Sequence, residues 1–127
     1  MGINTGATQV VPKRKICVMS MKVLNEVRDD LIRMKVVQGE TEFCVGWLGR
    51  GIGYMRTLRF VEQGPSAEVL AILTSKLGHY ADRFGVAGDG QAELAARFSV
   101  LRQRCQLALE AHARRRWTAE ERMNYGA

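Results

Sequence analysis

Apolar residues recur at intervals of three and four along most of this chain, and this spacing is the strongest constraint on its fold. One such stripe consists of Leu24, Val27, Leu31 and Met34. These intervals place side chains on one face of an α-helix. The only β-like stretch is Ile16–Val18, and no partner strand exists for it. The spacing therefore predicts an all-α protein.

Glycines and capping residues divide this pattern into helices. Ser20 suits a helix N-cap, so we expect a first helix from there to about residue 38, ended by Gly39. A short second helix is expected from Glu40 or Thr41 to Leu48, with acidic residues at its N-terminus.

A tight glycine turn, Gly49-Arg50-Gly51, leads into a third helix over about 52–63. Its expected core face consists of Tyr54, Leu58 and Val61. At 100° per residue, Ile52, Arg56 and Arg59 lie together on the opposite, outward face.

The fourth helix is expected to begin after Gly64-Pro65, with Ser66 as its N-cap. Its buried stripe is predicted to be Val69, Leu70, Leu73 and Leu77, continued by Tyr80 and Phe84.

A last long helix is expected over about 91–115, after a second glycine-rich break. Thr118 to Glu121 form a capping-box pattern that predicts one more short turn of helix after Trp117. Residues Leu94, Phe98, Leu101 and Cys105 form a heptad-like seam on the long helix.

The chain has 127 residues, 46% of them hydrophobic, which is enough for one core but too short for most enzyme architectures. We expect a flexible basic N-terminal arm over 1–19, a helix-turn-helix domain over 20–85, and a C-terminal helix over 86–127.

The net charge of +6 indicates a polyanionic partner without specifying which one. Most of the surplus lies at the two ends, where Lys13, Arg14 and Lys15 form one cluster and Arg114–Arg116 another. Residues 39–88 carry balanced charge, so the placement of individual arginines matters more than the total.

Three cysteines, an odd number without metal-type spacing, predict free thiols in a reducing cytoplasm. No apolar run is long enough to span a membrane, and no signal peptide is visible. His79 and His112 are isolated, and no catalytic constellation is present. We therefore expect no metal, no cofactor and no enzymatic activity.

The stretch Thr41–Leu77 contains a Trp47-Leu48-Gly49 turn and a Pro65-Ser66 helix start. On these residues, about 21–80 resemble the lambda-repressor-like (XRE-type) helix-turn-helix DNA-binding domain. The resemblance implies a bundle of four to five helices whose third helix enters the major groove of double-stranded DNA. The groove would be read by Arg56 and Arg59 with Ile52 and Thr57, while Arg50 and Lys13, Arg14 and Lys15 would contact phosphate or the minor groove.

The C-terminal seam has two interpretations. Residues Leu94, Phe98, Leu101 and Cys105 either pack on the bundle within one chain or pair with a second copy. Dimerisation suits DNA recognition because a two-fold protein reads two half-sites.

The resulting hypothesis is a small dimeric bacterial transcriptional regulator. The alternative is a helical protein-interaction module, an anti-activator or adaptor that keeps the fold without base-specific DNA binding. Gly51, Gly53 and the balanced charge of 39–88 favour that alternative, whose partner would bind through Trp47 or the C-terminal helix.

Overall fold

The computed structural model describes residues 11–86 and 90–125, and in these ranges every regular element is helical and no strand occurs. This confirms the all-α prediction. The chain order is α1 (Lys13–Arg33), α2 (Glu40–Glu42), the π-helical segment η2 (Phe43–Trp47), α3 (Tyr54–Val61), α4 (Ala67–Gly85) and α5 (Ala92–Tyr125).

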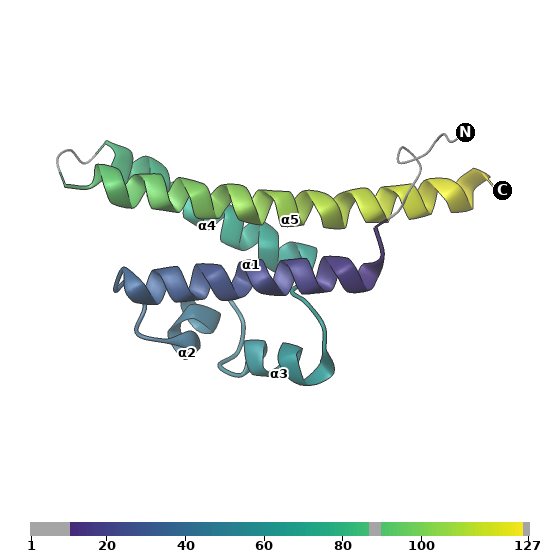
Figure 1. The fold of residues 1–127 in the computed structure, drawn as a ribbon, viewed down its shortest axis with the longest axis horizontal. Helices are drawn as coiled ribbons and strands as arrows, with labels where there is room; N and C mark the ends of the chain where they lie inside the picture. The colour runs from purple at the N-terminus through teal and green to yellow at the C-terminus, as the bar shows by residue number, and fades with distance from the viewer. Residues whose placement is uncertain (1–10, 87–89, 126–127) are drawn as a thin grey trace.

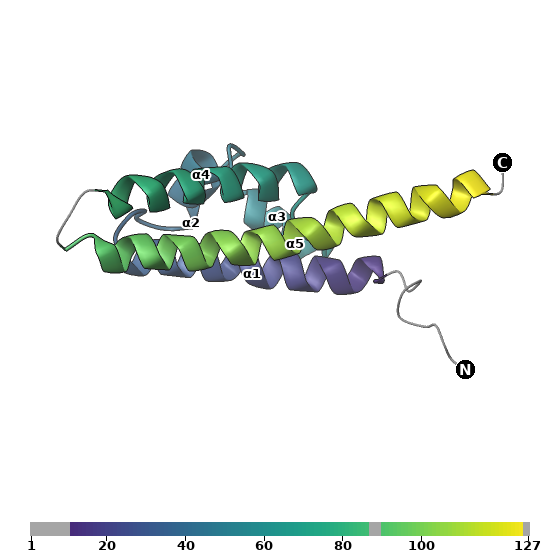
Figure 2. The same cartoon turned by 90° about the horizontal axis from the view of Figure 1, so that it is seen from above.

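The three long helices form the body of the protein. Helix α5 packs against α4 and α1 and runs antiparallel to both, and its C-terminal part extends beyond them (Figures 1 and 2). The short α2 and α3 lie together on the side of α1 that faces away from α5 (Figure 1). This arrangement leaves α3 at the edge of the molecule.

One core joins all of these elements, and an aromatic cluster lies at its centre. Phe98 of α5 is completely buried. Its ring stacks on that of Trp47, with a centroid distance of 6.2 Å and an interplanar angle of 9°, and on that of Phe84 at 5.5 Å. Tyr80 completes the cluster, 6.0 Å from Phe98 and 5.3 Å from Trp47.

The C-terminal seam packs within the chain. Phe98, Leu101 and Cys105 belong to the buried core, and Leu94 is half-buried against it. Of the two interpretations of the seam, the structure shows the intramolecular one, and Phe98, Leu101 and Cys105 offer no surface to a second copy.

Helix α1 begins seven residues before the predicted start, so the boundary at Ser20 was wrong. Ser20 lies in mid-helix and is buried, and its hydroxyl is 3.0 Å from Nε2 of His112 on α5. Ile16 is also buried, which favours extending the helix toward Pro12, its N-cap. The predicted flexible arm over 1–19 is therefore helical from Lys13, and residues 1–10 lie outside the described residues.

Helix α5 also differs from the prediction, because it continues without a break past residue 115. Thr118 does not cap a new helix. Its hydroxyl donates to the carbonyl oxygen of Arg114, 2.6 Å away and one turn earlier, and so remains inside a continuous helix.

The short helices lie close to their predicted positions. Helix α3 begins at Tyr54, after both Gly51 and Gly53, so these glycines belong to the turn that precedes the helix. Its buried residues are Met55 and Leu58, and the prediction that Val61 is a core residue was wrong because its side chain is exposed.

The fourth helix follows the prediction closely. Ser66 caps α4 by accepting a hydrogen bond from the backbone N–H of Val69 at 3.2 Å. The stripe predicted to be buried is buried, and it consists of Val69, Leu70, Leu73 and Leu77.

The aromatic cluster gives a first testable prediction. We expect Phe98→Ala to lower the free energy of unfolding by about 3–5 kcal/mol, because the cavity left behind borders three rings from two elements, η2 and α4. Urea denaturation followed by circular dichroism measures this change. Val100→Ala, on the exposed side of the same helix, is the matched control and should change stability by less than about 0.5 kcal/mol. Equal effects of the two substitutions would contradict the central place of Phe98.

Candidate functional site

The turn between η2 and α3 is shaped by its glycines. Gly49 has φ +67°, a left-handed conformation that side chains other than glycine rarely adopt. At Gly53 an added Cβ would lie 3.3 Å from Nη2 of Arg56, so the missing side chain leaves room for that guanidinium at the start of α3. The turn thus depends on the conformational freedom of Gly49 and accommodates Arg56 at Gly53.

The outward face of α3 is open to solvent. Arg56, Thr57 and Phe60 are all exposed, as is Ile52 in the preceding turn. Among the described residues, the Arg56 side chain makes no hydrogen bond or ion pair. Of the residues predicted to face a groove, Ile52, Arg56 and Thr57 are therefore accessible on one side of the molecule.

Arg59 has a different environment, because it forms a two-pronged ion pair with Glu40. Its Nη1 and Nη2 donate to Oε1 and Oε2 of Glu40 at 3.1 and 2.9 Å, and Arg28 of α1 donates to Oε1 at 2.6 Å. These three residues, which we call the Glu40 brace, join α1, α2 and α3. Hydrogen bonding from Arg59, and then from Arg28, lowers the pKa of Glu40. Arg59 thus positions α3, and its charge is largely neutralised.

The three basic residues predicted for a flexible arm project instead from the first turn of α1. Lys13 lines the same hollow as Arg50, Tyr54 and Leu58, whereas Arg14 lines a small hollow with Arg59. Lys15 lies on another side of α1, in the groove next to α5. Two of the three residues therefore flank α3.

Arg50, in the glycine turn, is the third basic residue that flanks α3, after Lys13 and Arg14. Its Nη2 is 3.4 Å from Oε1 of Glu68, and its guanidinium lies over the Tyr54 ring, 5.8 Å from the centroid. The contact with Glu68 is long and the Glu68 side chain is exposed, so it offsets little of the charge of Arg50.

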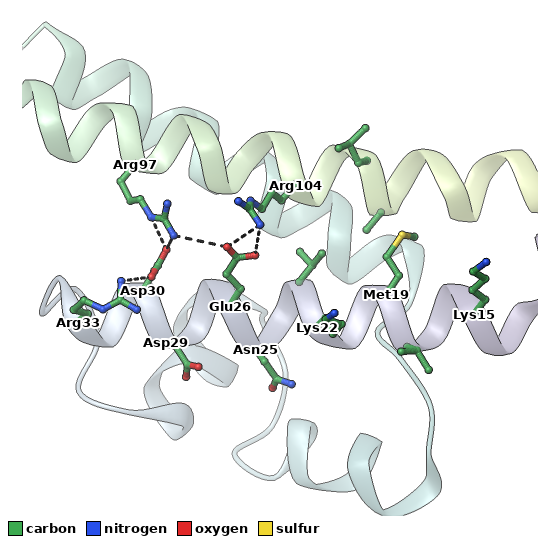
Figure 3. A pocket seen from close by; sticks show the side chains of 14 residues that line it. Lys15, Met19, Lys22, Asn25, Glu26, Asp29, Asp30, Arg33, Arg97 and Arg104 are labelled. Atoms are coloured by element: carbon green, nitrogen blue, oxygen red, sulfur yellow. Dashed lines mark hydrogen bonds and ion pairs between the residues drawn. The ribbon is translucent and has the colours of Figure 1, made fainter.

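A second surface, which sequence reasoning missed, is a groove of about 860 Å³ between α1 and α5 (Figure 3). Asp30 of α1 is only 2% exposed, and its carboxylate pairs with Arg33 and with Arg97 of α5. Glu26 accepts from Arg104 at 3.0–3.1 Å (Figure 3). A buried carboxylate requires such partners, so we interpret the network as the attachment of α5 to α1.

Trp47, expected as a possible contact with a protein partner, and Cys105, a residue of the C-terminal seam, are both buried. Trp47 is in the core, with the Lys76 ammonium 4.7 Å from its ring centroid, so it offers little surface to a protein partner. Burial raises the pKa of the Cys105 thiol to about 12, which keeps it protonated and unreactive at neutral pH.

Neither a metal site nor a membrane span is found in the described parts of the chain. The side chains that the structure describes, those of residues 11–86 and 90–119, contain no group of three or more His, Cys, Asp or Glu able to hold a metal ion. Within the same residues, no helix combines the length and apolar character needed to cross a membrane.

Comparison with known proteins gives one match. The sequence profile of a family of unknown function (DUF6626) matches residues 24–118, a range that contains α2, η2, α3 and α4 completely. Neither the curated proteins nor the solved structures gave a match to the chain.

The Glu40 brace gives a second prediction. We expect Glu40→Gln to lower the free energy of unfolding by roughly 1 kcal/mol at pH 7, because two arginines lose a partly exposed ionic partner. The lowered pKa of Glu40 means that its contribution is present above the unfolded pKa of about 4.3 and is lost as pH falls below it.

The difference between wild type and variant should therefore vanish near pH 3, measured by urea denaturation at several pH values. Asp82→Asn, at an exposed carboxylate on α4 outside the brace, is the control and should show no such difference. A difference that is the same at pH 3 and pH 7 would contradict an ionic role for Glu40.

Proposed function

The chain belongs to this family of unknown function, and we propose that it is a double-stranded DNA-binding protein that acts as a bacterial transcriptional regulator. One observation carries the proposal. The outward face of α3 is uncovered, Arg56 on it lacks a partner among the described residues, and basic side chains lie beside the helix.

The dimensions of α3 suit a major groove. An α-helix with its side chains is about 10–12 Å across, and the major groove of B-DNA is about 12 Å wide, so the groove admits a helix such as α3. Arg56 would donate to a guanine through two parallel hydrogen bonds, the commonest specific contact. Thr57, Phe60 and Ile52 would make hydrogen-bonding and apolar contacts, including contacts with thymine methyl groups.

Phosphate contacts would come from the residues beside α3. Lys13 and Arg50 lie at one hollow next to the helix, and Arg14 lies at another. In DNA-binding proteins such contacts fix the register of the protein on the duplex, whereas base contacts provide specificity. Arg59, held by Glu40, would set the angle of α3 without reading bases.

The resemblance to lambda-repressor-like domains is part of the same proposal, as are a cytoplasmic location and a homodimer. The helix order supports the resemblance, since two short helices joined by a glycine turn precede the capped α4. Because the seam of α5 is in the core, a second copy would contact other parts of that helix, where Leu107 and Trp117 are exposed.

A second candidate function is a helical protein-interaction module, and one observation favours it. Phe60 on α3 is 87% exposed and stands next to the exposed Val61, while the charge of the neighbouring Arg59 is neutralised. An exposed aromatic residue beside an aliphatic one is typical of protein contacts. A partner protein would then cover the face that we assign to DNA.

The third prediction tests DNA binding directly. Selection from a pool of random DNA duplexes should enrich one sequence. If the protein is a homodimer, that sequence should be a palindrome, and the mass of the protein in solution is measured alongside to establish its oligomeric state. For that sequence, we expect Arg56→Ala to weaken binding about 5- to 150-fold, because one base contact of 1–3 kcal/mol is lost. Arg83→Ala, an exposed arginine near the end of α4, is the control and should bind as the wild type does.

The fourth prediction separates phosphate contacts from base contacts. Lys13→Ala and Arg14→Ala should weaken binding to all duplexes equally, and each should reduce the slope of log K against log salt by about 1. Fluorescence anisotropy between 50 and 200 mM salt measures this slope. A pool without enrichment, together with equal affinities of wild type and Arg56→Ala, would contradict DNA reading and favour the interaction module.

A further inference from the structure

A concave site lies where five parts of the chain meet, at the edge of the proposed DNA-binding face. It is a hollow of about 760 Å³ between the first turn of α1, the glycine turn, α3, the start of α4 and the C-terminal half of α5. Its basic lining consists of Lys13, Arg50, Arg115 and Arg116, with His112 beside them. We call it the arginine hollow.

Charge in the arginine hollow is strongly unbalanced. The one carboxylate in its described lining is Glu68, and that side chain is three-quarters exposed and 3.4 Å from Arg50. Helix α4 begins at Ala67 in the wall, so the positive end of a 19-residue helix adds to the field. Four basic side chains thus line a space to which the described residues contribute a single carboxylate.

Two polar atoms in this wall lack partners within the described residues. They are Nε of Arg50 and Nε of Arg115, both buried without a hydrogen-bond acceptor. Buried N–H donors are normally satisfied, and an anion in the hollow would offer acceptors to both guanidinium groups. The guanidinium groups come from segments 65 residues apart in the sequence, so no local feature of the chain explains their convergence.

His112 also experiences the positive charge of the arginine hollow. Burial, and then the charge of Arg115, lowers the pKa of His112. Its ring also contacts the hydroxyl of Ser20, so it is fixed on the α1 side of the hollow.

We propose that the arginine hollow binds a small phosphorylated molecule, with Arg50 and Arg115 gripping the phosphate and Lys13 adding charge. Arginine suits this role because its planar fork donates two parallel hydrogen bonds to phosphate oxygens. The volume falls within the range of about 300–1,000 Å³ that is typical of small-molecule sites, and so leaves room for more than the phosphate group itself.

A ligand in this place would act on α3. Arg50 belongs to the turn that precedes α3, and Tyr54 and Leu58 of α3 form part of the wall. Occupancy would tie this turn to α5, so the ligand would be an effector that changes the affinity for DNA. The effect on DNA affinity rests on the proposed function, whereas phosphate binding itself does not.

The experiment uses the full chain without DNA. Inorganic phosphate and adenosine 5′-monophosphate are titrated at constant ionic strength, with adenosine as the neutral control, and binding is followed by calorimetry and by amide NMR shifts. We expect saturable binding of both phosphates and none of adenosine. Arg50→Ala and Arg115→Ala should each weaken binding at least 10-fold, whereas Arg83→Ala and Lys22→Ala should not.

A second readout distinguishes binding in the hollow from binding elsewhere. Phosphate should raise the pKa of His112 in NMR titration, because an added anion offsets the nearby cations. The charged or titratable groups that share the hollow with it are Lys13, Cys17, Arg50, Tyr54, Glu68, Arg115 and Arg116. Thermal unfolding of each variant checks that it is folded.

Three outcomes would overturn the proposal. The first is that phosphate shows no saturable binding, and the second is that Arg83→Ala weakens phosphate binding as much as Arg50→Ala and Arg115→Ala do. The third is that the pKa of His112 does not change when phosphate saturates the protein. If Arg115→Ala weakens binding of a short DNA duplex while neither free phosphate binds, the hollow belongs to the DNA interface and not to an effector. If both phosphates bind and no duplex does, the effector site stands and the proposed function fails.

Discussion

The stacking of Trp47 on Phe98 is the contact on which the arrangement of this protein depends. Trp47 belongs to the short helices and Phe98 to α5, so one pair of rings fixes the region around α3 to the long helical body. Tyr80 and Phe84 add α4 to the same cluster. The spacing of a heptad-like seam does not say which surface will cover it. In this protein Trp47, Tyr80 and Phe84 of the same chain pack on Phe98 of the seam. The position of α3 at the edge of the molecule follows from this packing (Figure 1).

The parts of the fold that could be predicted are those determined by nearby residues. The cap at Ser66 and the buried stripe of α4 follow from spacing and from hydrogen bonds within one turn. The start of α1 does not, because Ser20 has the composition of a cap but finds its partner in His112, 92 residues away. Thr118 similarly has the residue type of a cap but bonds within a continuous α5. A local pattern indicates what a residue is able to do, and tertiary packing decides what it does.

In the candidate site, too, the features set by nearby residues could be predicted and those set by tertiary packing could not. Helical geometry placed Arg56 and Arg59 on an outward face, and both are exposed. Their difference comes from Glu40, which is 19 residues before Arg59 and pairs with it across two helices. Periodicity within one helix contains no information about such a partner. For the same reason the sequence did not indicate that Lys13, Arg50 and Arg115 line one hollow. They belong to α1, the glycine turn and α5, and only the tertiary packing of these segments brings them together.

The π-helical segment Phe43–Trp47 has a consequence for how this chain can change over evolutionary time. Its wider turn, closed by the bond from Leu48 N–H to the Phe43 carbonyl at 3.1 Å, holds one residue more than an α-helical turn would. Losing one residue there would restore a regular helix and rotate the downstream chain by about 100°. Phe43 and Trp47 would then no longer face the core together. The length of this segment is therefore constrained along with its buried side chains.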